Sequence, residues 1–245
     1  MSNPVLNNRF LENERVLDSA PMTVVGAINK SLILFSLLFL SAAFTWGSFM
    51  AGFVDRAQLL TKVGAIAGFV LAIIIILGRN KDTYKFLTPL YAICEGCFVG
   101  GISAFFESAI AGIVSQAVVA TFVTILSMLA LYRVGLIRAT EKFRSVLLIS
   151  TSSVCIIYLI QLVASFFGRS IPEIFTASPV GIGFSVFVVI IAALNLILDF
   201  DFIERGAEDM FDKEFEWYGA FGLMVTIVWL YIEMLQLLAK LNSRN

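Results

Sequence analysis

The sequence contains no histidine and few charged residues. Its 245 residues include 17 Lys and Arg and 18 Asp and Glu, so that only 14% are charged, against about 25% in soluble globular domains. Without an imidazole, His-dependent catalytic triads, HExxH zinc sites and His-ligated haem are excluded. The formal net charge of −1 provides no excess of positive charge for a polyanion. We therefore expect no nucleic-acid partner.

Cysteine is also scarce, and its placement argues against redox or metal chemistry. Cys94 and Cys97 form a CxxC with no second pair, and Cys155 lies in another apolar stretch, so we interpret all three as packing residues. An intramembrane aspartyl protease would need Gly-x-Gly-Asp, whereas the run 181–183 is followed by Phe184. We expect a protein that is not an enzyme and requires no cofactor.

Long apolar segments dominate the rest of the chain, of which 59% is hydrophobic. A bilayer core needs roughly 20 apolar residues per helix, and the intervals between charged residues mark seven such segments. These intervals are 30–55, 62–79, 85–107, 107–133, 144–169, 173–199 and 216–240. Since open backbone is not tolerated in lipid, each segment must be helical. The sequence predicts an all-α membrane protein, a bundle of seven transmembrane helices.

The ends of these segments predict the domain organisation and the orientation. Residues 1–24 are polar and are expected to form an N-terminal tail, followed by a single seven-helix transmembrane domain over 25–245. Twelve of the 17 Lys and Arg residues fall on the N-terminal side of the membrane. By the excess of positive charge in cytoplasmic loops, the N-terminus is cytoplasmic and the C-terminus outside.

Three carboxylates within the apolar segments need an explanation, because ionised groups at bilayer depth usually face a protein interior or a water path. They are Glu95, Asp199 and Glu233. Glu95 lies ten residues after Lys85, near the middle of the third span. Two interpretations are open for it: a neutral acid that is hydrogen bonded across a helix interface, or a functional intramembrane acid.

Glycines surround Glu95 in the sequence. Gly96, Gly100 and Gly101 form a small-residue face of the kind that lets a second helix approach closely.

Asp199 and Glu233 lie on consecutive antiparallel spans, so they could share one site. Two carboxylates a few ångströms apart cannot both ionise cheaply, and such a pair would hold a proton near neutral pH. Deprotonated, the pair would present oxygen ligands suited to calcium. Asp199, however, stands at the end of the sixth span. The two meet only if the last span begins late, near Phe221, or if Asp199 is carried deeper.

Other polar features have two interpretations or none. The acidic segment 201–216 is read either as a solvated loop or as a vestibule that concentrates cations. Asn195 is interpreted as an interhelical hydrogen-bonding residue, and Trp229 receives no role.

Short motifs in the third, sixth and seventh spans point to one family. The run that begins Glu95-Gly96 is similar to the Glu-Gly motif of the Bax inhibitor-1 family, and the polar N-terminal extension resembles that of a bacterial branch of this family. Asp199 followed four residues later by Ile203 is similar to its sixth-span aspartate motif, and 230–233 (Leu-Tyr-Ile-Glu) resembles its Leu-Tyr-Leu-Asp segment. Glutamate at 233 departs from the usual aspartate.

The resemblance implies a bundle with the seventh helix central. It also implies a pH-sensitive calcium leak channel of the bacterial inner membrane, gated by Asp199 and Glu233 as a pH sensor. Calcium is then the permeant ion or an ion bound by these two carboxylates, and the lipid bilayer is the surrounding partner. The alternative is a non-transporting regulator that binds another membrane protein, such as a membrane protease or a stress-response component.

Overall fold

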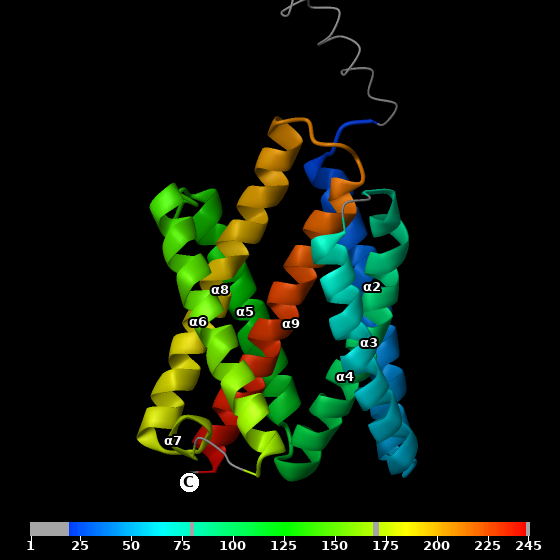
Figure 1. The fold of residues 1–245 in the computed structure, drawn as a ribbon, viewed down its shortest axis with the longest axis vertical. Helices are drawn as coiled ribbons and strands as arrows, with labels where there is room; N and C mark the ends of the chain where they lie inside the picture. Colours follow the sequence, from blue (N-terminus) through cyan, green and yellow to red (C-terminus); the bar gives the residue numbers. More distant parts are fainter. Residues whose placement is uncertain (1–19, 79–80, 169–171, 244–245) are drawn as a thin grey trace, which may run out of the picture.

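The computed structural model describes residues 20–78, 81–168 and 172–243, and within these ranges the chain is helical with no strand (Figure 1). Seven of the helices are long and apolar enough to cross a membrane, which confirms the predicted fold class. The helices are α2 (Val24–Met50), α3 (Val54–Leu77), the short 3-10 helix η2 (Lys81–Thr83), α4 (Tyr84–Ala109), α5 (Ile113–Arg133), α6 (Glu141–Phe166), the single turn α7 (Pro172–Phe175), α8 (Pro179–Glu208) and α9 (Phe215–Asn242).

Two helices extend well beyond the boundaries that charged residues suggested. α3 begins at Val54, eight residues before Lys62, where the predicted interval starts, and has 24 residues. α8 continues to Glu208, nine residues past Asp199, where the sequence placed the end of the span. The prediction was wrong there because a charged side chain near a membrane surface can extend from a continuous helix without ending it.

Polar side chains determine several of the helix ends. Thr140 and Ser178 accept hydrogen bonds from the backbone amides of Phe143 and Gly181, which caps α6 and α8. The Glu107 carboxylate accepts the amides of Gly112, at 2.7 Å, and Val114, at 3.1 Å. Glu107 therefore caps α5, because a carboxylate at a helix N-terminus satisfies free amides and complements the helix dipole.

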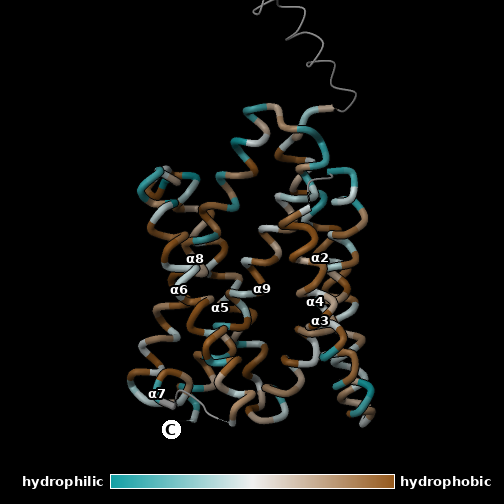
Figure 2. The backbone as a smooth tube through the Cα atoms, viewed as in Figure 1, coloured by the Kyte–Doolittle hydropathy of each residue, from teal (hydrophilic) through white to brown (hydrophobic). Residues whose placement is uncertain are grey.

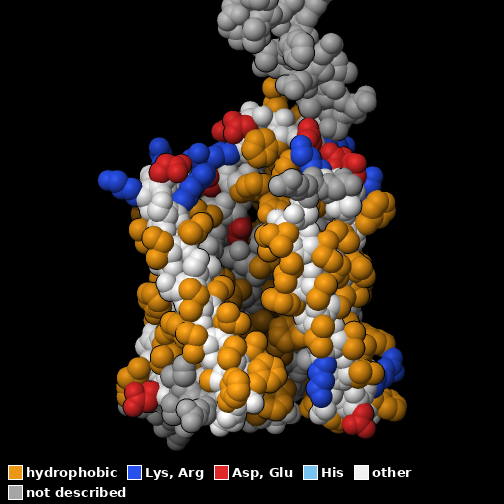
Figure 3. All heavy atoms as spheres, viewed as in Figure 1, with side chains coloured by type: hydrophobic (Ala, Val, Ile, Leu, Met, Phe, Trp, Pro, Cys, Tyr) orange, Lys and Arg blue, Asp and Glu red, His pale blue; other side chains and the backbone are white. Residues whose placement is uncertain are grey.

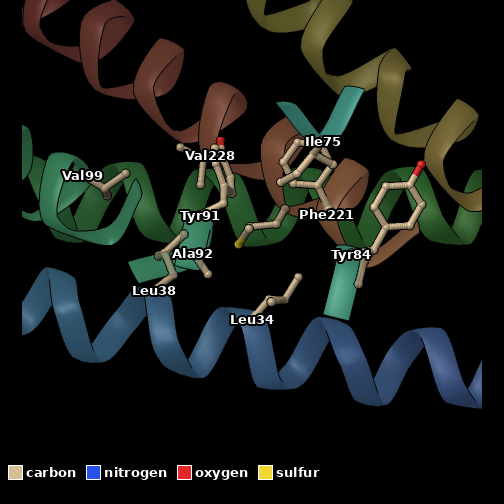
Figure 4. Packing of buried hydrophobic residues seen from close by; sticks show 11 residues of the cluster. Leu34, Leu38, Ile75, Tyr84, Tyr91, Ala92, Val99, Phe221 and Val228 are labelled. Carbon is tan, nitrogen blue, oxygen red and sulfur yellow. The ribbon is translucent and has the colours of Figure 1, made fainter. Parts of the chain in front are cut away.

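Helix α9 crosses the middle of the bundle, between α2, α3 and α4 on one side and α5, α6 and α8 on the other (Figure 1). It packs on α2, α4, α5 and α8, and Figure 4 shows Phe221 and Val228 of α9 against Leu34 of α2 and Tyr91 of α4. Of the most apolar stretch of each helix, 50% is buried in α8 and 44% in α9, but only 11% in α6. The predicted central position of the seventh span is confirmed, and α8 shares it.

The outside of the bundle is apolar along most of its length. Leu40, Ile66, Phe69 and Leu148 expose 68–70% of their surface, and hydrophilic residues gather towards the two ends (Figure 2). Apolar exposure of this extent is not stable in water. The structure therefore describes an integral membrane protein whose sides face lipid.

The acidic segment predicted over 201–216 is mostly helical, since α8 ends at Glu208 and α9 begins at Phe215. Towards its C-terminal end, two carboxylates bind neighbouring elements. Asp212 forms an ion pair with Lys81 at 2.5 Å, and Glu216, which is 2% exposed, accepts the amide and the hydroxyl of Thr23 at the start of α2. The predicted solvated loop is thus reduced to residues 209–214, of which Asp212 binds Lys81, whereas Glu216 already belongs to α9. Of the predicted tail 1–24, residues 1–19 lie outside the described residues.

Glycines on α4 hold the α2, α3 and α4 helices in close contact. A Cβ at Gly96 would meet Ser41 and Leu38 of α2, and a Cβ at Gly100 would overlap the backbone of Ala42. Gly101 faces Thr61 of α3 in the same way. The predicted small-residue face is therefore used for helix packing, as it is in other membrane bundles.

Substitution of Gly100 by alanine should destabilise the bundle. The added methyl group meets the backbone of α2, which cannot move aside as a side chain can, so we expect a loss of about 1–3 kcal/mol in the free energy of unfolding. Thermal unfolding in detergent micelles measures it. Gly47→Ala is the matched control, because a Cβ there has no neighbour within 4 Å. Equal stability of the two variants would contradict the close contact.

Candidate functional site

Asp199 lies inside α8 and faces α9. Its Oδ1 is the atom that a Cβ on Gly222 would meet, at 3.4 Å, and the Thr226 hydroxyl lies one helical turn further along α9, beside the same carboxyl. Its Oδ2 is buried and has no hydrogen-bond partner. The continuation of α8 beyond Asp199 explains this depth, so the prediction that Asp199 ends its span is corrected.

Glu233 is buried on α9 and is 2% exposed. Its Oε1 accepts hydrogen bonds from the Tyr158 hydroxyl of α6, at 2.8 Å, and from Trp229 Nε1 on its own helix, at 3.1 Å. Its Oε2 is buried without a partner. Each of the two predicted carboxyls therefore has one buried oxygen that no other group satisfies, which is uncommon because a buried polar atom without a partner is costly.

The two carboxyls lie at different levels along α9: Asp199 of α8 lies beside Thr226, and Glu233 belongs to α9 itself. Glu233 follows Thr226 by seven residues on one face of the helix, which is about 10 Å at 1.5 Å per residue. No hydrogen bond joins Asp199 and Glu233, since the partners of both acids are other groups. α9 begins at Phe215, so the late start near Phe221 is wrong, whereas the deeper position of Asp199 is found.

A hollow lies between the two groups of helices in Figure 3, with an acidic side chain visible inside it. At the end of the bundle where α2 begins, a cavity of about 570 Å³ is lined by residues of α5, of α8 and of the connection between α5 and α6, including Tyr132, Arg138, Asp201 and Glu204. This cavity is polar and its entrance carries charges of both signs.

Asp201 is the buried acid of that cavity and binds two arginines. It is 6% exposed and pairs with Arg144 of α6 and with Arg205, whose Nε lies 3.0 Å from its carboxylate. Tyr132 of α5 donates a hydrogen bond to Glu204, one turn along α8 from Asp201. These contacts fix the end of α8 to α5 and α6.

Glu95 stands apart from the other two acids. Its carboxyl faces Gly68 of α3, with Oε2 3.1 Å from where a Cβ there would be, and Tyr91 lies one turn before it. It thus lies in the interface between α3 and α4, on the glycine-packed side of the bundle. Glu95 thus lies at a helix interface, as the first interpretation has it, but its hydrogen-bonding partner Tyr91 belongs to its own helix and not to the neighbouring one.

The described residues hold no group of three or more His, Cys, Asp or Glu side chains that could bind a metal ion together. Asp199 and Glu233 each offer one carboxylate at a separate depth. The two carboxylates therefore do not form one shared set of ligands.

Comparison with protein-family models assigns the chain. A model described as Bax inhibitor 1 like matches residues 3–243, nearly the whole sequence. The chain belongs to the Bax inhibitor 1 like family. No curated protein and no solved structure matches it.

The motifs that suggested this family occupy two distinct places. The Glu-Gly motif lies where α4 meets α2 and α3, since Gly96 packs on α2 and Glu95 faces α3. The sixth-span and seventh-span motifs, with Asp199 and Glu233, lie on α8 and α9 in the middle of the bundle. In this member of the Bax inhibitor 1 like family, only the second and third motifs belong to the candidate site.

Several residues of the site had no clear signal in the sequence. Tyr158 is a single tyrosine in an apolar span, and no role for Trp229 was predicted from the sequence, yet both donate to Glu233. Thr226 and Arg144 were also missed. A signal for Trp229 was present, since it precedes Glu233 by four residues and such residues are neighbours on a helix. Asn195 was interpreted correctly, because it donates to Thr151 of α6.

Replacement of Asp201 by asparagine should weaken the attachment of α8 to α6. It removes the counterion of Arg205 and the nearer of two from Arg144, which also lies 3.9 Å from Glu141; both arginines are partly exposed, at 50% and 37%. We expect a loss of about 1–3 kcal/mol in the free energy of unfolding. Asp209→Asn, an exposed position next to the same cavity, should change stability by less than about 0.5 kcal/mol. Denaturant unfolding of both variants in micelles provides the comparison, and equal values would refute the role of Asp201.

Proposed function

We propose that the protein is a pH-sensitive calcium leak channel in which Asp199 and Glu233 form the gate. The observation that supports this proposal is that each carboxyl keeps one buried oxygen without a hydrogen-bond partner. Carboxylate oxygens are preferred ligands of calcium. An unsatisfied oxygen in the middle of a membrane bundle is a group that a passing cation or a proton can bind.

The polar groups between α8 and α9 provide successive binding positions for such a cation. The Asp201 cavity lies at the end of the bundle where α2 begins, Asp199 and Thr226 come next, and Glu233 follows about 10 Å further along α9. Apolar side chains surround this line of polar groups. A charged group at these depths normally marks an ion or proton path.

Protonation provides the pH dependence of the proposal. A neutral carboxyl has no charge to attract calcium, whereas an ionised one does, so calcium flux should rise with pH and fall as the acids take up protons. The bundle responds through a shift between closed and open populations.

We further propose that the membrane is the inner membrane of a bacterium, with the N-terminus cytoplasmic and the C-terminus outside. The distribution of Lys and Arg supports this orientation, because Lys81, Arg133, Arg138 and Arg144 belong to the end of the bundle where α2 begins.

Flux through reconstituted protein tests the gate. Asp199→Asn and Glu233→Gln mimic the protonated acids, so each should reduce calcium flux at pH 8 and remove most of its dependence on pH. Proteoliposomes loaded with a calcium-sensitive dye measure this between pH 5.5 and 8.5. Glu95→Gln is the matched control, since that acid lies between α3 and α4 and should leave the pH profile unchanged.

Two results would contradict the proposal. If Asp199→Asn and Glu233→Gln both keep the pH dependence of the unmodified protein, the two acids are not the gate. If the purified protein moves no calcium at any pH, the alternative function is favoured, namely a regulator that acts by binding another membrane protein such as a protease.

A further inference from the structure

Lys240 is enclosed by oxygen atoms at the end of the bundle opposite to the start of α2. Its Nζ donates to the carbonyl oxygens of Ile174 and Gly181, both at 3.1 Å, and to the Ser185 hydroxyl at 2.8 Å. An ammonium group has three donors, so all of them are used. These three oxygens come from α7 and from the first two turns of α8, and they surround a positive charge carried by α9.

The oxygens around Lys240 are held in place by a buried serine and by the hydrogen-bonded turn that precedes α8. Ser185 is 2% exposed. A Cβ on Gly181 would meet the carbonyl oxygens of Glu173, Ile174 and Thr176, so glycine allows the chain before α8 to fold back on the helix. The Ser178 hydroxyl donates to the Glu173 carbonyl and thereby holds this turn in place. The turn directs several carbonyl groups to one place, independently of Lys240.

We propose that this group of oxygens is a binding site for a small monovalent cation, which the Lys240 ammonium occupies as a tethered ion. Backbone carbonyls and hydroxyls arranged around one point replace the hydration shell of sodium or potassium. The three oxygen ligands of Lys240 include no carboxylate, and this favours a monovalent cation over calcium. The ligands are therefore those of a site for a monovalent cation, although the Lys240 ammonium takes the place of the free ion.

The position of Lys240 connects this site with the acids of the candidate gate. Lys240 follows Glu233 by seven residues on the same face of α9, about 10 Å along the helix, a separation at which opposite charges in a medium of low dielectric constant attract each other. This part of the inference rests on the proposed function: the tethered ammonium closes the far end of the polar line and repels a cation that has reached Glu233. The cation site itself does not depend on conduction.

Lys240→Met tests the site, because methionine keeps much of the apolar stem and removes the charge. The variant should gain stabilisation by sodium or potassium chloride that choline chloride does not give. At a cation concentration ten times the dissociation constant, we expect the unfolding temperature in micelles to rise by about 3–6 °C. The unmodified protein, whose site is filled, should show no such difference between the salts.

Two further variants sharpen the comparison. Lys240→Met combined with Ser185→Ala loses one of the three oxygens, so the cation response should weaken at least about tenfold in apparent affinity, as for the loss of one hydrogen-bonding partner. Lys62→Met removes an exposed lysine from the same end of the bundle and should gain no cation response. If Lys240→Met is too unstable to purify without added cations, its folded yield in sodium or potassium against choline gives the same comparison.

Equal responses of Lys240→Met to choline, sodium and potassium would overturn the cation site. Calcium flux tests the connection with the gate separately, and Lys240→Met should leak several-fold faster than the unmodified protein. If Lys240→Met responds to the cations but its calcium flux is unchanged, Lys240 does not close the end of the polar line, and the cation site is still supported. Absence of flux from every variant would overturn the proposed function, while the stability measurements would still decide on the cation site.

Discussion

The contact between α8 and α9 is the constraint on which the rest of this structure depends. Hydrocarbon offers no hydrogen bonds, so every polar side chain inside a bundle must find its partners in the protein. Asp199 finds the Thr226 hydroxyl, and Glu233 finds Tyr158 and Trp229, because α9 crosses the middle of the molecule. The same contact leaves one oxygen of each acid unsatisfied, and that shortfall is what a proton or a cation can relieve.

The bundle separates packing from polar chemistry. Around α4, glycines bring α2 and α3 into contact, and Glu95 is kept in that interface beside Gly68. Around α9, the residues at intervals of seven on one face are Thr226, Glu233 and Lys240, and each meets a different polar group of α6, α7 or α8. A helix is stiff along its axis, so these three groups keep their order and spacing in the membrane. A path built on this face has a defined sequence of steps.

Both ends of the polar line are fastened by charged contacts. At one end, Asp201 joins α8 to Arg144 of α6, and Glu216 joins the start of α9 to Thr23 of α2. At the other, Lys240 joins the end of α9 to α7 and α8. Helices α8 and α9 are thus held at both ends and meet through polar groups between them. A change of charge in the middle would therefore act on two helices whose ends are restrained.

The sequence by itself determined the class of the molecule, because hydrocarbon forces long apolar segments into helices. It also identified Asp199 and Glu233, since acids at bilayer depth need a reason. Only the tertiary structure decided that α8 continues past Asp199, that Glu95 lies elsewhere, and that Tyr158, 75 positions away, binds Glu233. The rotation of each helix and the choice of its neighbours depend on side chains of several helices that pack together. No stretch of a single helix contains that information.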